Sequence, residues 1–212
     1  MLTNWGYSID IIGNLPALLS VDEFNTMTAG KYATDSRVAT TLSSVSSAIR
    51  SYVGWHLAGE YSCELELSYD DLHIVRNDRD IDIRLPVGYV TGVSHIFFDA
   101  KKEDGVWDGM EFIFTHKSNG LIRVYNVPQC FERFSKVVIL FTAGLSDEFA
   151  MGIKSIVAQK TSHILSAPTG ITNETAGGVS ISYSANYVNS AKTSLLTDDK
   201  EALLPFKVTE LL

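Results

Sequence analysis

Apolar residues recur at helical spacing in a segment that begins near residue 38. Their positions are separated by steps of four, three, four, three and one, which places them on one stripe of a helix, with Arg50 facing elsewhere. Asp35 is expected to cap this helix and Gly54 to end it. The apolar stripe consists of Val38, Leu42, Val45, Ile49, Tyr52 and Val53.

A second long helix is predicted after Ser146 or Asp147, either of which can cap it, and it stops before Pro168. Its apolar residues also recur at helical steps. This predicted face consists of Phe149, Ile153, Ile156, Val157 and Ile164.

The N-terminal segment contains one local helix signal. Ser20 and Glu23 have the S/T-x-x-E spacing of a capping box, which predicts a short helix from residue 20 through Thr28. The 19 residues before it contain Gly6, Gly13, Asn14 and Pro16, which break any period, and are expected to form an extended arm.

Between the two long helices the hydrophobic period changes from helical spacing to two. Cys63, Leu65 and Leu67 alternate with polar residues, and residues 81–85 repeat the pattern. Glycine, aspartate and asparagine clusters separate these runs from later β-branched and aromatic ones. Six or seven short antiparallel strands are predicted, the later ones at residues 93–98, 110–114, 121–125 and 137–141.

After the second long helix, a loop rich in threonine and glycine is predicted over residues 169–178. A brief strand with alternating Val179, Ile181 and Tyr183 follows. The chain then continues into a helical turn capped by Asp198-Asp199 and breaks at Pro205.

The predicted fold class is α+β, with two main α-helices bracketing a β-rich antiparallel insertion and extended N- and C-terminal arms. The absence of internal repeats and long linkers predicts a single domain over residues 1–212. Its parts are an arm (1–19), a helical part (20–58), the β-rich insertion (59–144), a helix (145–166), and a loop, short strand and C-terminal segment (167–212).

Charge and cysteine content narrow the class of protein. The formal net charge of −8 indicates a poor dedicated DNA binder, because such a surface repels phosphate on average. Cys63 and Cys130 form no disulfide framework and are expected to be reduced thiols, as in a cytosolic protein. No apolar run approaches the length of a membrane span, and the N-terminal residues lack the basic start of a signal peptide.

The motif content of the sequence predicts no enzyme, no cofactor and no metal site. No histidine pair has the spacing of a helical metal site, and phosphate-binding loops and serine elbows are absent. Asp78, Asp80 and Asp82 form a D-x-D-x-D run without the glycine and glutamate of a calcium loop. These aspartates are expected to line the solvated face of a strand.

The end of the first long helix resembles the first helix of bacteriophage head–tail connector (adaptor) proteins. In that family, a helix ending in an Ile-Arg-x-Tyr-x-Gly-Trp-His-like phrase leads into the strands. The corresponding segments are Asp35-Ser36-Arg37 and Ala48-Ile49-Arg50-Ser51-Tyr52-Val53-Gly54-Trp55-His56.

Four further segments resemble the family in the same order along the chain, whereas the arm over residues 1–19 and the loop over residues 101–110 depart from its pattern. The four resembling segments are Leu85-Pro86 with Thr91-Gly92-Val93, the run 137–144 ending Phe-Thr-Ala-Gly, the loop 166–174 with residues 177–181, and Leu195-Leu196-Thr197 with Leu203-Leu204-Pro205-Phe206.

The resemblance implies a structural virion protein of the neck, assembled in the host bacterial cytoplasm. It implies a homo-oligomeric ring, commonly of twelve copies, that docks on the portal protein, lines the channel for passing DNA without sequence-specific binding, and receives the tail through a tail-completion or stopper protein. No membrane partner is expected. The family's portal-contacting C-terminal segment corresponds here to Leu203, Leu204, Phe206, Val208, Leu211 and Leu212.

Two alternatives to the connector remain. The first is another neck, tail-completion or carbohydrate-binding virion module, for which Trp5 and Trp107 are the candidate aromatic platforms. The second is a hydrolase with a dispersed site. The C-terminal apolar residues could also fold back on their own domain instead of docking on a partner.

Overall fold

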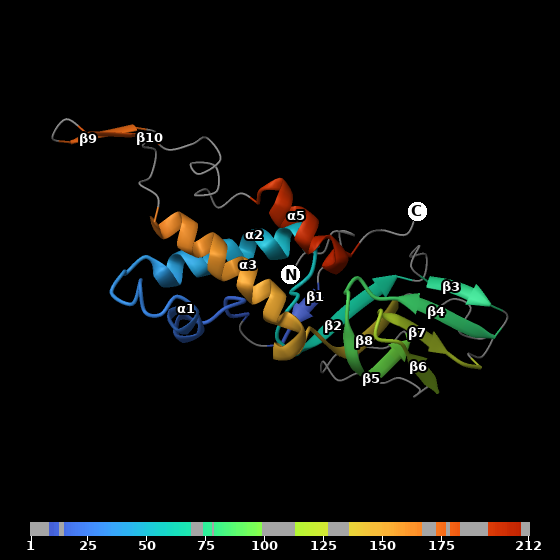
Figure 1. Cartoon of the computed structure of the whole chain (residues 1–212). Coiled ribbons are helices and arrows are strands. Elements are labelled where there is room, and N and C mark those ends of the chain that lie inside the picture. The colour runs from blue at the N-terminus through green and yellow to red at the C-terminus, as the bar shows by residue number, and fades with distance from the viewer. Residues whose placement is uncertain are drawn as a thin grey trace. The chain divides into compact units, whose positions relative to one another are not determined.

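The computed structural model describes the parts of the chain drawn in colour in Figure 1. Contacts divide the chain into two units: unit 1 comprises Met1–Leu15, Gly54–Ser146 and Lys207–Leu212, and unit 2 comprises Pro16–Val53 and Asp147–Phe206. A single domain over residues 1–212 stays a prediction. The described residues are 9–12, 15–68, 74–77, 79–98, 113–126, 136–166, 173–176, 179–182 and 195–208.

Unit 2 contains the helices. The short helix α1 begins as predicted, because the Ser20 hydroxyl accepts the Glu23 backbone N–H at 3.2 Å and the Glu23 carboxylate accepts the Ser20 N–H at 2.9 Å. This reciprocal pair confirms the capping box. The helical elements are α1 (Val21–Met27), α2 (Val38–Val53), α3 (Asp147–Ser166), α5 (Thr197–Leu203) and the 3₁₀ turn η2 (Leu204–Phe206).

Helix α2 confirms most of the predicted stripe. Val38, Leu42, Val45, Ile49 and Val53 are buried, whereas Tyr52 is half-buried. At the entrance, the Asp35 carboxylate accepts the Arg37 N–H at 2.9 Å, and the helix ends before Gly54, whose φ is +86°. The expected position of Arg50 on the outer face is wrong, since this side chain is buried. Its long aliphatic stem allows such burial.

Helix α3 buries a different stripe from the predicted one. Ile153 and Val157 are buried as expected, but Phe149 is 61% exposed and Ile156 and Ile164 are half-buried. The covered stripe is offset because small residues and two lysine stems complete it. Its members are Ala150, Ile153, Lys154, Val157, Ala158, Lys160, Thr161 and Leu165.

Unit 1 contains two four-stranded antiparallel sheets. The first has the order β1-β2-β8-β5, and Cys63, Leu65 and Leu67 of β2 are buried as predicted. Strand β1 corrects the expectation of an irregular N-terminal arm, because it pairs with β2 from Ile9↔Leu65 to Ile11↔Cys63. The strands are β1 (Ile9–Ile11), β2 (Tyr61–Ser68), β5 (Val90–Phe98) and β8 (Lys136–Ala143).

The second sheet has the order β3-β4-β7-β6. Ile81 and Ile83 on β4 pair with Val124 and Ile122 on β7, and all four are buried, which confirms the predicted alternation. Strand β3 is not predicted from the sequence, and residues 110–112 of one predicted strand lie outside the described residues. The strands are β3 (Ile74–Asn77), β4 (Asp80–Arg84), β6 (Phe114–His116) and β7 (Leu121–Val124).

A separate hairpin follows α3 in the sequence. Strands β9 (Asn173–Ala176) and β10 (Val179–Ser182) pair antiparallel, from Asn173↔Ser182 to Ala176↔Val179. The predicted strand at 179–183 is therefore present through Ser182, with Tyr183 outside the described residues, and the predicted loop at 169–178 is wrong where β9 forms. The α+β fold class is confirmed, with the long helices α2 and α3 bracketing strands β2 to β8 in sequence, whereas β1 precedes α2.

Candidate partner-binding surfaces

Two carboxylates of the D-x-D-x-D run, Asp80 and Asp82, hold residues of the second sheet and its loops, and Asp78 lies outside the described residues. The Asp82 carboxylate accepts two hydrogen bonds of 2.6 Å from Arg123 on the neighbouring strand, and Asp80 accepts the Asn126 N–H at 3.2 Å. Asp82 holds the pKa of the Arg123 guanidinium above its ordinary value. Among the described residues, no group of three or more histidine, cysteine, aspartate or glutamate side chains is arranged to hold a metal ion.

Cys63 is a free, buried thiol whose pKa burial raises to about 11, so it is a weak nucleophile at neutral pH. Cys130 lies outside the described residues. In the part of the chain that the structure describes, no helix has the length and apolarity needed to cross a bilayer.

The Gly-Trp-His phrase after α2 builds part of the core of unit 1. Trp55 and His56 are each 1% exposed, and their rings meet edge-on at 5.4 Å between centroids. The His56 Nε2 lies 2.7 Å from the Ala143 carbonyl oxygen. A Cβ on Gly88 would lie 2.8 Å from the Trp55 ring. The phrase therefore has a structural role, and it contacts the Phe-Thr-Ala-Gly segment some 87 residues later.

Beside this core, two glycines allow the backbone to approach itself closely. Gly144 has a φ of +134°, and a Cβ placed on it would lie 1.9 Å from the Gly59 carbonyl oxygen. Next to them, Ala58 and Leu145 form a parallel bridge, in which the Leu145 N–H donates to the Leu57 carbonyl at 2.8 Å. The two segments that join unit 1 to α2 and α3 are thereby fixed to one another.

Helix α1 is tied to α3 by a charged cluster. The Lys154 ammonium donates to the Glu23 carboxylate at 2.6 Å and to the Asp147 carboxylate at 2.8 Å. The hydrogen bond from Lys154, followed by those from Ser20, lowers the pKa of Glu23 from 4.5 to about 2. No local sequence pattern predicts this cluster, because Lys154 and Glu23 are 131 residues apart.

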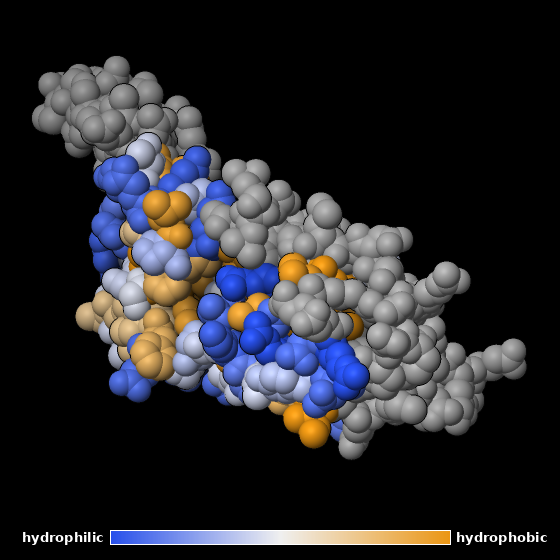
Figure 2. Space-filling view, turned by 90° about the vertical axis from the view of Figure 1, so that its right-hand side faces the viewer, coloured by the Kyte–Doolittle hydropathy of each residue, from blue (hydrophilic) through white to orange (hydrophobic). Residues whose placement is uncertain are grey.

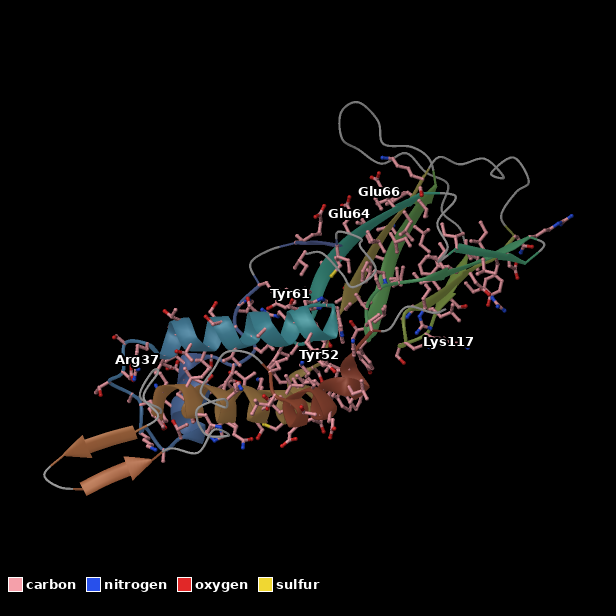
Figure 3. All side chains as sticks on the ribbon, turned by 90° about the horizontal axis from the view of Figure 1, so that it is seen from above. Arg37, Tyr52, Tyr61, Glu64, Glu66 and Lys117 are labelled. Carbon is pink, nitrogen blue, oxygen red and sulfur yellow. The ribbon has the colours of Figure 1, made fainter. Side chains whose placement is uncertain are left out.

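Helix α5 is held by polar contacts at its first turn. The N-cap residue is Leu196, so the predicted cap at Asp198-Asp199 lies instead in the first turn of the helix, where the Asp199 carboxylate accepts the Leu196 N–H at 2.9 Å. The same Asp199 carboxylate lies 3.4 Å from the ammonium of Lys160, whose side chain is 2% exposed. The Tyr52 hydroxyl donates to the Lys200 carbonyl at 3.2 Å, and Figure 3 labels Tyr52 on α2.

A groove of about 250 Å³ lies between α3 and α5. Lys160 and Asp199 meet in it, and Asp198 and Leu196 line its α5 side. The other lining residues are Ile156, Gln159, His163 and Ala202.

The six residues predicted to bind a portal fall into three groups. Leu203 is fully buried, so in this structure it anchors α5. Leu204 is 58% exposed, whereas Phe206 and Val208 are half-buried. Leu211 and Leu212 lie outside the described residues. Figure 2 shows that exposed apolar residues, coloured orange, also gather between hydrophilic ones on one face.

The polar clusters of the described residues hold secondary-structure elements together. The fold is similar to that of a chain in a solved structure described as "Neck of native GTA particle computed with C12 symmetry", a gene transfer agent particle. The TM-score is 0.56 at 15% sequence identity, and the match covers 97% of this chain and 97% of that chain. No protein-family model and no curated protein sequence matches the chain.

Proposed function

We propose that this chain is a non-enzymatic neck subunit of a phage-like particle, a ring-forming adaptor between head and tail. The observation that carries the proposal is the fold match to a neck chain over 97% of both proteins. The connector resemblance of the sequence supports it independently. Two of the resembling segments, around His56 and Ala143, contact each other in unit 1, as parts of one shared core would.

The proposed assembly is a ring, with twelve copies as the expected number. The support for this number is the C12 symmetry given for the similar neck structure. A cyclic ring needs two different complementary surfaces on each subunit, since the contact closes by rotation. The net charge of −8 suits a channel through which DNA slides, because a basic lining would retain the phosphate backbone. A tail-completion or stopper protein would bind the ring on its tail side.

Portal docking is proposed for the C-terminal segment. Among the described residues of this segment, Leu204 is a large apolar side chain that is exposed, and Phe206 and Val208 follow it half-buried. Burying such side chains against a partner is favourable, at about 25 cal/mol for each Å² removed from water. Leu211 and Leu212 stay in the proposed docking set, whereas Leu203 is proposed as its anchor.

The test is electron microscopy of the protein mixed with the portal protein encoded near it, beside the protein alone. We expect a ring with rotational symmetry stacked on the portal. A portal that stays bare at protein concentrations well above micromolar would instead favour another neck, tail or carbohydrate-binding module.

Leu203 and Leu204 provide a matched pair of variants for this experiment. Leu204→Asp is expected to abolish portal docking with an unchanged melting temperature, because the side chain is already in water. Leu203→Ala is expected to lower the free energy of unfolding by about 2–5 kcal/mol, the cost of emptying a core position. Docking by Leu204→Asp at wild-type affinity would remove this residue from the proposed interface.

A further inference from the structure

A buried ammonium lines the groove between α3 and α5. The Lys160 side chain is 2% exposed, and a lysine ammonium only donates hydrogen bonds, never accepting them. No described residue accepts a hydrogen bond from it, although the Asp199 carboxylate lies 3.4 Å away as its ion-pair partner. A buried donor without an acceptor is costly, and each such group in a folded protein needs an explanation. The groove therefore presents hydrogen-bond donors to a group that enters it.

The groove is large enough to hold a side chain. Its volume of about 250 Å³ is several times the roughly 30 Å³ that one water molecule occupies in the liquid. Ile156, Leu196 and Ala202 contribute apolar surface to its walls. Apolar walls with a few well-placed polar groups are typical of sites that bind a ligand. An aliphatic stem that ends in a polar group fits this lining.

The charges around the groove select an uncharged polar group. Lys160 on α3 carries a positive charge, whereas Asp198 and Asp199 on α5 carry negative ones. An anionic ligand would be repelled by the two aspartates, and a cationic one by the buried ammonium. A side-chain amide avoids both penalties, because its carbonyl oxygen accepts hydrogen bonds and its NH₂ group donates them. The carbonyl can accept from Lys160 while the NH₂ group donates to the Asp198 carboxylate.

The position of the groove indicates which partner supplies this amide. Ala202 on α5 lines the groove, and Leu204, the exposed side chain proposed to dock on the portal, follows directly after α5. A portal segment that covers Leu204 therefore lies next to the α5 wall of the groove. The two contacts would form one continuous docking surface.

We propose that the groove between α3 and α5 receives the side-chain amide of an asparagine or glutamine from the portal protein. The inference rests on the proposed function and deepens it, since it names a second docking contact and its chemistry. The apolar contact at Leu204 supplies buried area. The amide in the groove supplies specificity, because a site with buried polar groups rejects a partner that leaves them unpaired.

Closing the groove tests this contact. Ala202→Trp places an indole in it, and Ala202 is exposed, so the fold should tolerate the substitution. Ser43→Trp on α2 is the matched control, because Ser43 is also small, uncharged and exposed but does not line the groove. Biolayer interferometry measures the dissociation constant for the portal protein, and the melting temperature reports folding. We expect Ala202→Trp to weaken binding at least about tenfold, because the indole clashes with the entering side chain, and Ser43→Trp to leave binding unchanged.

The charge of the bound group is tested on α5 itself. Asp198→Asn and Glu201→Gln each remove one negative charge from the helix, but of the two only Asp198 lines the groove. For an uncharged amide, Asp198→Asn should weaken portal binding by about two- to fivefold, since a neutral acceptor replaces a charged one. This factor, taken relative to Glu201→Gln, should be the same at low and at high salt. A charged partner group would instead make the factor shrink as salt is added.

The other outcomes are distinguishable from one another. Portal binding by Ala202→Trp at wild-type affinity, or an equal loss in Ser43→Trp, would overturn the groove contact and leave docking through Leu204 intact. Loss of ring formation by Ala202→Trp with unchanged portal affinity would mean that a second copy fills the groove, which overturns the portal as the partner. A salt-dependent factor for Asp198→Asn would overturn the amide. A wild-type protein that leaves the portal bare overturns the proposed function together with this inference.

Discussion

Gly144 occupies a position where the backbone of unit 1 leaves no room for a side chain. A Cβ there would lie 1.9 Å from the Gly59 carbonyl oxygen, and the φ of +134° is itself unfavourable for other residues. We expect Gly144→Ala to lower the free energy of unfolding by about 4 kcal/mol or more, or to prevent folding. Urea denaturation followed by circular dichroism measures the loss.

Gly152 is the control for that substitution. It lies inside α3, and nothing is within 4 Å of a Cβ placed on it. Gly152→Ala should raise the free energy of unfolding by about 0.5–1 kcal/mol, because alanine has the higher helix propensity. Equal destabilisation by the two substitutions would contradict the assignment of Gly144 as a close-contact position.

Glu23 makes stability depend on pH in the acidic range. Its pKa falls from 4.5 to about 2 in the folded chain, chiefly through the hydrogen bond from Lys154. A lowered folded pKa gives stability that is present above pH 4.5 and is lost as the pH falls toward 2. Wild type should therefore exceed Glu23→Gln in unfolding free energy at neutral pH, with the difference disappearing near pH 2.

Lys154→Met provides the comparison for the pH series. Without its ammonium, the main cause of the lowered Glu23 pKa is removed. In this background the pH-dependent effect of Glu23→Gln between pH 2 and 4.5 should be smaller but still present, because the hydrogen bonds from Ser20 also lower the Glu23 pKa. An effect of unchanged size would show that Lys154 is not the main cause of the lowered pKa.

At the scale of elements, α5 is held to α3 by an ion pair whose two residues differ in burial. Lys160 is buried, whereas the Asp199 side chain is 21% exposed, and their charged atoms are 3.4 Å apart. Asp199→Asn keeps an acceptor for the Leu196 N–H but leaves the buried ammonium without its carboxylate. We expect Asp199→Asn to lower the free energy of unfolding by about 3 kcal/mol. Lys160→Met should lower it by about 1 kcal/mol or less, because this substitution removes the buried charge.

Differential scanning calorimetry of the two variants compares these costs. The sign of the difference is the informative result, because both substitutions remove the same ion pair. If Lys160→Met proved the more destabilising, the Lys160 stem would matter through packing and not through its charge.

The elements most accurately predicted are those with local signals. The capping box at Ser20 and Glu23 involves residues three apart, and α2 has a regular apolar stripe ending at a glycine. In α3 the apolar spacing gives the helix but not its covered face. Lys154 and Lys160 are buried because Glu23 and Asp199 reach them from distant segments, which no local pattern contains.

Strand β1 illustrates the same limit in a sheet. Three residues beside glycine and proline carry almost no strand signal by themselves, and Ile9 is buried only because β2 offers an edge. The candidate surfaces follow the same pattern. The sequence predicts an apolar C-terminal segment, but whether Leu203 or Leu204 faces solvent depends on how α5 packs.

At the scale of the whole molecule, the sequence predicts the α+β class and the order of its parts. It does not predict which distant segments meet. The Gly-Trp-His phrase and the Phe-Thr-Ala-Gly phrase are recognisable separately, and only the structure brings His56 to Ala143 and Gly59 to Gly144. The division into two units is likewise invisible in the sequence, because unit 2 is formed by two stretches separated by the long segment Gly54–Ser146.

The bridge between Ala58 and Leu145 has a mechanical consequence. Two of the chain crossings between the units occur after Val53 and after Ser146, and the bridge fastens the segments beside these crossings to each other within unit 1. A pulling force that reached unit 1 through α2 and α3 would be shared by the two bridged segments. The backbone hydrogen bonds between these segments would have to break before unit 1 could be pulled open from this end.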